Sequence, residues 1–160
     1  MAKEECNMIK IRRYSTADHD HVWRIHLLVI SEAGVEPTHK HYHDIFHIEE
    51  QYIQDGGDFV VGTDIKGNIL AMGGLKRLND NTAEIKRLRV HPSHQKKGYG
   101  QLLLNKLELR AKDLGFAQIY LDALHNQYGA HKLFEKNGYI EKGPTVIDGF
   151  DVVVFEKTLA

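Results

Sequence analysis

The segment HPSHQKKGYGQLLLNKL (91–107) places two closely spaced glycines and a basic stretch before an apolar run with helical spacing. Gly98 and Gly100 stand where the helix should begin, and neither has a Cβ to obstruct a close approach to the backbone. The first amides of a helix lack partners within it and form the positive end of its dipole. With Lys96 and Lys97 beside them, these amides could bind a phosphate or a diphosphate. The alternative is a tight turn flanked by solvated lysines.

Two well-known phosphate motifs do not fit this segment. It lacks the G-x-x-x-x-G-K-[ST] pattern of P-loop NTPases. Leu103 stands at the third-glycine position of the G-x-G-x-x-G pattern, which characterises dinucleotide-binding folds. A P-loop NTPase and a Rossmann-type enzyme are therefore poorly supported.

The elements around the glycine turn must bring it to the end of a strand. The preceding stretch TAEIKRLRV (82–90) is typical of a strand, and the step from Ile85 to Leu88 breaks the alternation and predicts a bulge or a splay. The helix after the turn should end at Gly115. The other expected elements are strands at 8–14, 58–65, 68–78, 117–124 and 150–159, helices at 19–34 and 129–138, and a short helix with loops within 37–55. This order predicts an α/β sandwich of mixed sheet and helices.

Composition favours an ordinary globular protein. The chain has 160 residues, 42% hydrophobic and 27% charged, and a formal net charge of -1, so no overall field attracts nucleic acid or a membrane. A single cysteine, Cys6, excludes an internal disulfide framework and fits a reducing compartment. The chain shows no apolar run of membrane-spanning length and no signal peptide, so we expect a cytoplasmic protein.

The stretch from Glu84 to Phe116 resembles the core motif of the GNAT N-acetyltransferase superfamily. In that motif a strand ends in an apolar-x-Val-x-Pro pattern, and [QR]-x-x-G-x-[GA] then opens a long helix. The matching residues here are Leu88, Val90, Pro92, Gln95, Gly98 and Gly100. The likeness covers 59–158 with its motifs and the N-terminal part by element order. It implies one domain over 1–160, with a mixed, mostly antiparallel central β-sheet flanked by helices.

The resemblance also implies acetyl-CoA as the co-substrate. Backbone groups of Leu88, Arg89 and Val90 would pair with the pantetheine arm as if it were another strand. Some relatives carry an Asn or Gln at the position of Gln127 that touches the pantetheine or the phosphates; an exposed residue near a helix start is the alternative. The amides that would hold the diphosphate are those of Gln95, Lys96, Lys97, Gly98, Tyr99, Gly100 and Gln101.

In the family the amine attacks the bound thioester directly, and a carboxylate at the position of Glu84 often acts as base through water. A surface carboxylate paired with Lys86 or Arg87 is the alternative for Glu84. Many relatives use a tyrosine to protonate the leaving thiolate, but Phe134 stands at that position here. Either the thiolate leaves unassisted, or another group serves; the neighbours in sequence are Tyr128, Tyr139 and His125.

Four histidines crowd the segment THKHYHDIFH, at His39, His41, His43 and His47. His43 and His47 could face one metal ion on a helix, but no zinc-protease pattern or nearby cysteine completes a site. We therefore expect no metal, and instead exposed histidines that could contact the acceptor.

The sequence thus predicts an acetyl-CoA-dependent N-acetyltransferase acting on a primary amine, either a small molecule or a peptide. A catalytically weak, CoA-binding sensor of the same fold is the alternative, supported by Phe134. Neither nucleic acid nor a membrane is an expected partner, and the family resemblance suggests a homodimer.

Overall fold

A computed structural model describes residues 9–35 and 42–160, and seven strands form a single sheet there. The strands are β1 (Lys10–Arg13), β2 (Asp58–Thr63), β3 (Ile69–Arg77), β4 (Thr82–Val90), β5 (Gln118–Leu124), β6 (Ile140–Ile147) and β7 (Phe150–Thr158). Their order across the sheet is β1-β2-β3-β4-β5-β7-β6, and only the β4–β5 pair is parallel. The predicted mixed, mostly antiparallel sheet is confirmed.

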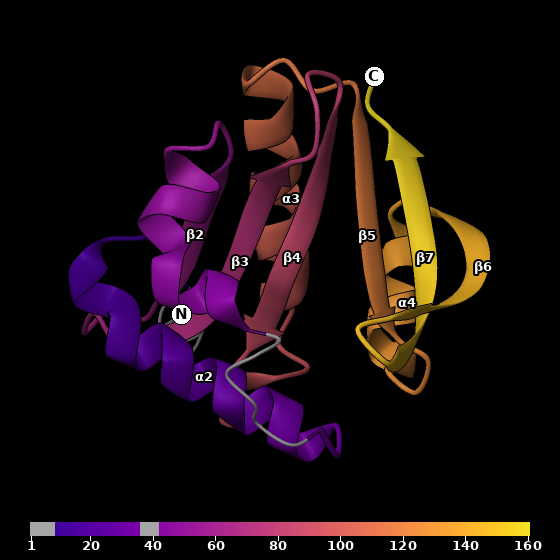
Figure 1. The fold of residues 1–160 in the computed structure, drawn as a ribbon. Coiled ribbons are helices and arrows are strands. Elements are labelled where there is room, and N and C mark those ends of the chain that lie inside the picture. Colours follow the sequence, from indigo (N-terminus) through magenta and orange to yellow (C-terminus); the bar gives the residue numbers. More distant parts are fainter. Residues whose placement is uncertain (1–8, 36–41) are drawn as a thin grey trace, which may run out of the picture.

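Helices cover both faces of the sheet (Figure 1). Helix α2 (His19–Glu32) lies on one face with a short 3-10 helix (His43–His47) and a π-helical turn (Glu49–Ile53), and α3 (Tyr99–Asp113) and α4 (Tyr128–Lys136) lie on the other. Each face has its own apolar core, because the strands alternate buried side chains between the two sides. The short helical segments confirm the helix expected within 37–55; residues 36–41 lie outside the described part. No helix in the described ranges is long and apolar enough to span a membrane.

Strand β4 carries the predicted bulge. Lys86 pairs with Gly74 and Arg89 with Met72, so Arg87 and Leu88 together oppose the single residue Gly73. Arg87 has a φ of 57°, a left-handed conformation that costs energy in a residue with a side chain. As a result, the bulge directs two successive basic side chains, Lys86 and Arg87, to the α2 face of the sheet.

Glycines end the helices where expected. Gly34, Gly115 and Gly138 follow α2, α3 and α4 with φ values of 77°, 89° and 85°. These left-handed conformations suit glycine, which lacks a Cβ.

No strand was predicted from the sequence at residues 140–147, but these residues form strand β6. The strand is almost wholly exposed, contains Gly143 and Pro144, and lies at the sheet edge, so no apolar alternation marks it. It pairs with β7 through a hairpin at Asp148 and Gly149, both with positive φ. An Asp-Gly pair is a strong hairpin signal and could have revealed this strand.

Candidate active site

Strands β4 and β5 part after three paired residues and open a cleft. Thr82, Ala83 and Glu84 pair with Gln118, Ile119 and Tyr120, and no pairing between the two strands continues beyond them in the described residues. In Figure 1 the two strands diverge toward the bottom of the view, where α2 and α4 lie. The cleft between them measures about 690 Å³. The edge of β4 from Ile85 to Val90 therefore presents main-chain groups that no neighbouring strand pairs.

The glycine turn lies at the wide end of this cleft and opens α3. Gly98 precedes the helix with a φ of 84°, and Lys96 also has a positive φ, of 63°. Within the described residues, the amides of Lys97, Gly98 and Gly100 donate to no protein acceptor. A Cβ on Gly98 would meet nothing within 4 Å, and one on Gly100 would meet only Leu133 Cδ2 at 3.5 Å. The turn thus offers free donors in open space, which fits an anionic group such as a diphosphate.

The residues predicted for the site come together in this cleft, except Lys97, which is exposed at the tip of the turn. Those lining it are Glu84, Leu88, Arg89, Val90, Gln95, Lys96, Gly98, Tyr99, Gly100, Gln101 and Gln127.

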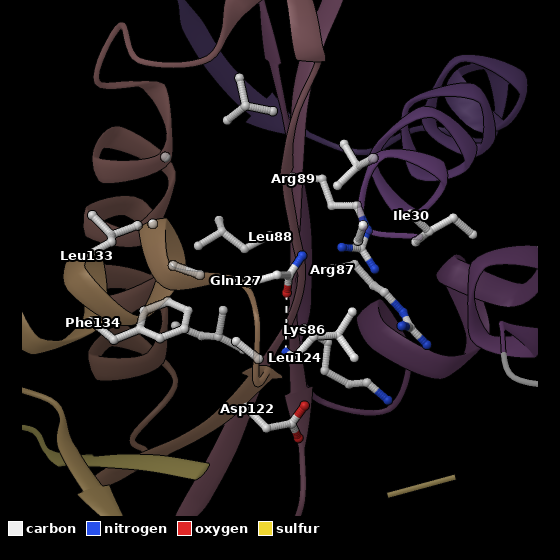
Figure 2. A pocket seen from close by; sticks show the side chains of 18 of the residues that line it. Ile30, Lys86, Arg87, Leu88, Arg89, Asp122, Leu124, Gln127, Leu133 and Phe134 are labelled. Atoms are coloured by element: carbon white, nitrogen blue, oxygen red, sulfur yellow. Dashed lines mark hydrogen bonds between the residues drawn. The ribbon is translucent and has the colours of Figure 1, made fainter. Parts of the chain in front are cut away.

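Three glutamines of the site have side chains already engaged by protein groups. Gln95 donates through Nε2 to the carbonyl of Val90 at 3.1 Å. Gln101 exchanges hydrogen bonds with Asn137 at the end of α4. Gln127 accepts from the amide of Leu124 through Oε1 at 3.3 Å, which caps the end of β5 (Figure 2). Gln95 and Gln101 can therefore offer a ligand mainly their main-chain amides.

The two faces of β4 differ in character beyond the bulge. Figure 2 shows Leu88 directed toward Leu133 and Phe134, and Arg87 and Arg89 directed to the opposite side. On the first side the cleft is apolar and lies between the ends of α3 and α4. On the second side it is cationic and lies against α2 and the 3-10 helix.

Two carboxylates flank the closed end of the cleft, Glu84 on β4 and Asp122 on β5. Burial raises the pKa of Glu84; Lys86 opposes this shift, and Asp122 adds to it. Burial likewise raises the pKa of Asp122, against the charge of Lys86 and a hydrogen bond from Tyr120. A carboxylate with a raised pKa is suited to accept a proton near neutral pH. Asp122 was not foreseen, although a carboxylate within the buried strand IYLDAL was a signal for it.

Arg87 is anchored by a residue distant in sequence. Its Nε and Nη2 donate to Asp44 at 3.0 and 2.8 Å, and Tyr52 donates its hydroxyl to the same carboxylate at 2.5 Å. Burial alone would raise the pKa of Asp44, but the hydrogen bonds and charge of Arg87 outweigh it and lower that pKa. The pair of Arg87 with Asp44 therefore holds the 3-10 helix against the bulge in β4.

None of the three nearby candidates for a proton donor to the thiolate lines the cleft. Phe134 lines the cleft and packs on Phe155, with ring centroids 5.4 Å apart. Tyr139 is buried and donates to Glu108 at 2.8 Å. Tyr128 is 67% exposed and His125 is exposed, and neither lines the cleft.

The histidine cluster gives no sign of a metal site in the part that the structure describes. His39 and His41 lie outside that part, as does Cys6. The rings of His43 and His47 are 4.5 Å apart, but no group of three His, Cys, Asp or Glu residues there could hold an ion.

Comparison with known families agrees with this geometry. The acetyltransferase (GNAT) family model matches residues 17–139. The chain belongs to this family. The match contains α2, the divergent β4–β5 pair, the glycine turn and α4.

Solved structures share the fold at low sequence identity. A GNAT-family acetyltransferase from Staphylococcus aureus Mu50 is 22% identical, with a TM-score of 0.88 over 96% of this chain and 100% of that one. The YncA protein of Salmonella typhimurium, solved with acetyl-CoA, is 18% identical, with a TM-score of 0.77 over 96% and 95%. A phosphinothricin acetyltransferase from Sinorhizobium meliloti, also with acetyl-CoA, is 17% identical, with a TM-score of 0.77 over 95% and 89%.

Proposed function

We propose that this chain is an acetyl-CoA-dependent N-acetyltransferase that acetylates a primary amine within one ternary complex. The observation that carries the proposal is the unpaired edge of β4 leading to free amides at Gly98 and Gly100. Such an edge suits an extended amide-containing arm, and the amides suit its diphosphate. The acetyl-CoA bound to the two neighbours of the same fold agrees with this assignment.

The residues of the closed end supply the proton transfers. When bound, acetyl-CoA provides an acetyl group on a thiol leaving group. Glu84, helped by Asp122, takes a proton from the ammonium of the acceptor, whose free amine then forms the C–N bond as the C–S bond breaks. The balance is one ammonium and one acetyl thioester in, and one amide, one thiol and one proton out. A main-chain amide of the strained bulge at Arg87 and Leu88 would be the hydrogen-bond donor to the oxyanion.

Phe134 favours a second candidate, a CoA-binding sensor with weak chemistry. Its buried ring leaves the thiolate without the usual hydroxyl. However, a thiol with a pKa of about 8.5 can leave without an acid, so this substitution does not prevent turnover.

An acceptor screen distinguishes the two candidates. Calorimetric binding of acetyl-CoA is measured first, and thiol release is then followed with amines, amino acids, polyamines and peptides. Release with at least one amine supports the transferase. Tight binding without release from any of them would favour the sensor. We further propose a cytoplasmic protein; the homodimer stays a prediction.

A further inference from the structure

Arg89 lies in the wall of the cleft, and no carboxylate among the described residues pairs with it. Its one hydrogen bond to a described residue runs from Nε to His26 Nδ1, at 3.2 Å. Burial, followed by the charge of Arg87, lowers the pKa of Arg89 to about 10, so it stays protonated at neutral pH. A half-buried charge with no counterion among the described residues is costly, whereas neighbouring Arg87 is paired with Asp44.

His26 fixes the direction of this guanidinium. Its side chain is fully buried, and burial, together with the charges of Arg89 and Arg87, lowers its pKa to about 2. The ring is therefore neutral, accepts at Nδ1 and carries its proton at Nε2. Because Nε of Arg89 is engaged in this way, its two terminal nitrogens remain for a ligand in the cleft.

The α2 face of the cleft thus has opposite charges at its two ends. Glu84 is the last residue of β4 that pairs with β5, so it lies at the closed end. Asp122 lies at the same end, and Figure 2 shows Lys86 between Asp122 and Arg89. Four residue steps of about 3.3 Å, after one residue is absorbed by the bulge, separate Glu84 from Arg89 by about 13 Å between Cα atoms. Side chains reaching in from both ends leave a gap the size of a small molecule.

We propose that the acceptor is a small amino acid whose carboxylate is bound by Arg89 while its amine faces Glu84 and Asp122. This inference rests on the proposed function and specifies its substrate class. A polyamine fits poorly, because its second ammonium would meet the cations Lys86 and Arg89. A planar guanidinium with two free nitrogens matches a carboxylate in two-pronged geometry.

The test compares each of the twenty L-amino acids with its carboxamide, beside spermidine and cadaverine. Carboxamides keep the amine and side chain and remove only the negative charge. We expect N-acetylation of at least one amino acid, with a KM about 10- to 100-fold lower than that of its carboxamide, as for a lost charge-assisted hydrogen bond. Equal or better use of the carboxamide or of a polyamine would overturn the proposal.

Single-residue variants test whether Arg89 is the group that binds the carboxylate. Arg89→Met should raise the KM for the amino acid about 10- to 100-fold and so remove its preference over the carboxamide. The control is Arg77→Met, which removes an exposed cation at the β3–β4 turn and should change none of these constants. An equal rise for the amino acid and its carboxamide would contradict carboxylate binding.

The proposed function can survive the failure of this inference. Thiol release with other amines, but with no amino acid, would remove the carboxylate subsite and leave the transferase intact. If acetyl-CoA does not bind at all, both proposals fail together.

Discussion

The two sides of β4 are built in different ways. On the side of α3 and α4, the cleft is formed by main-chain edges and by a turn that lies within a dozen residues of the strand. On the side of α2, it is formed by charged side chains, and Arg87 meets a carboxylate that is 43 residues away in sequence. The first side suits a ligand common to a whole family, and the second can vary with the acceptor.

The largest expected effect is on kcat and comes from replacing Glu84, at the closed end of the cleft. Glu84→Gln removes the proposed base and should lower kcat by about 10²- to 10⁴-fold. Acetyl-CoA affinity should stay unchanged, because the proposed diphosphate site lies on the other side of β4. Steady-state kinetics and calorimetry measure the two quantities, with the exposed Glu141→Gln as control. Turnover that survives Glu84→Gln would remove this residue from the mechanism.

The next prediction concerns the stability that the Asp44–Arg87 pair gives to the acceptor side. Asp44→Asn leaves Arg87 without its counterion and should lower the free energy of unfolding by about 3–5 kcal/mol. Asp80→Asn, which alters an exposed pair with Arg77, should change it by less than about 1 kcal/mol. Denaturant unfolding measures both, and equal effects of the two variants would contradict the anchoring role of Asp44.

The pH dependence of turnover reports on the closed end. As the proposed base, Glu84 would have to be deprotonated, and its pKa is raised by burial and by Asp122 against the opposing charge of Lys86. The rate should therefore rise with pH, about tenfold per unit below the apparent pKa, with a midpoint above the value of about 4.3 typical of Glu. A midpoint at or below the ordinary value would contradict a buried base.

The smallest expected effect comes from replacing single glycines. Two such variants distinguish backbone strain from the loss of acetyl-CoA binding. Gly98 and Gly115 both have left-handed φ, of 84° and 89°, with no atom within 4 Å of an added Cβ. Gly98→Ala and Gly115→Ala should each cost about 1–2 kcal/mol of stability. Only Gly98→Ala should also weaken acetyl-CoA binding, because only that Cβ would face the proposed diphosphate site. Equal affinity in both variants would show that the turn holds no ligand.

The sequence predicted the cofactor side better than the acceptor side. The glycine turn and the bulge at Ile85–Leu88 are local patterns, so composition and spacing reveal them. The pairing of Asp44 with Arg87, and the meeting of Arg89 with His26, depend on how distant segments fold together. Strand β6 was missed for a different reason, since an exposed edge strand carries no apolar alternation.

The crystal structure of the acetyl-CoA complex tests the central claim most directly. The predicted result is a diphosphate within hydrogen-bond distance of the amides of Gly98 and Gly100, with the pantetheine arm along Leu88–Val90. A thioester bound elsewhere, with these amides bonded to protein groups, would contradict the account.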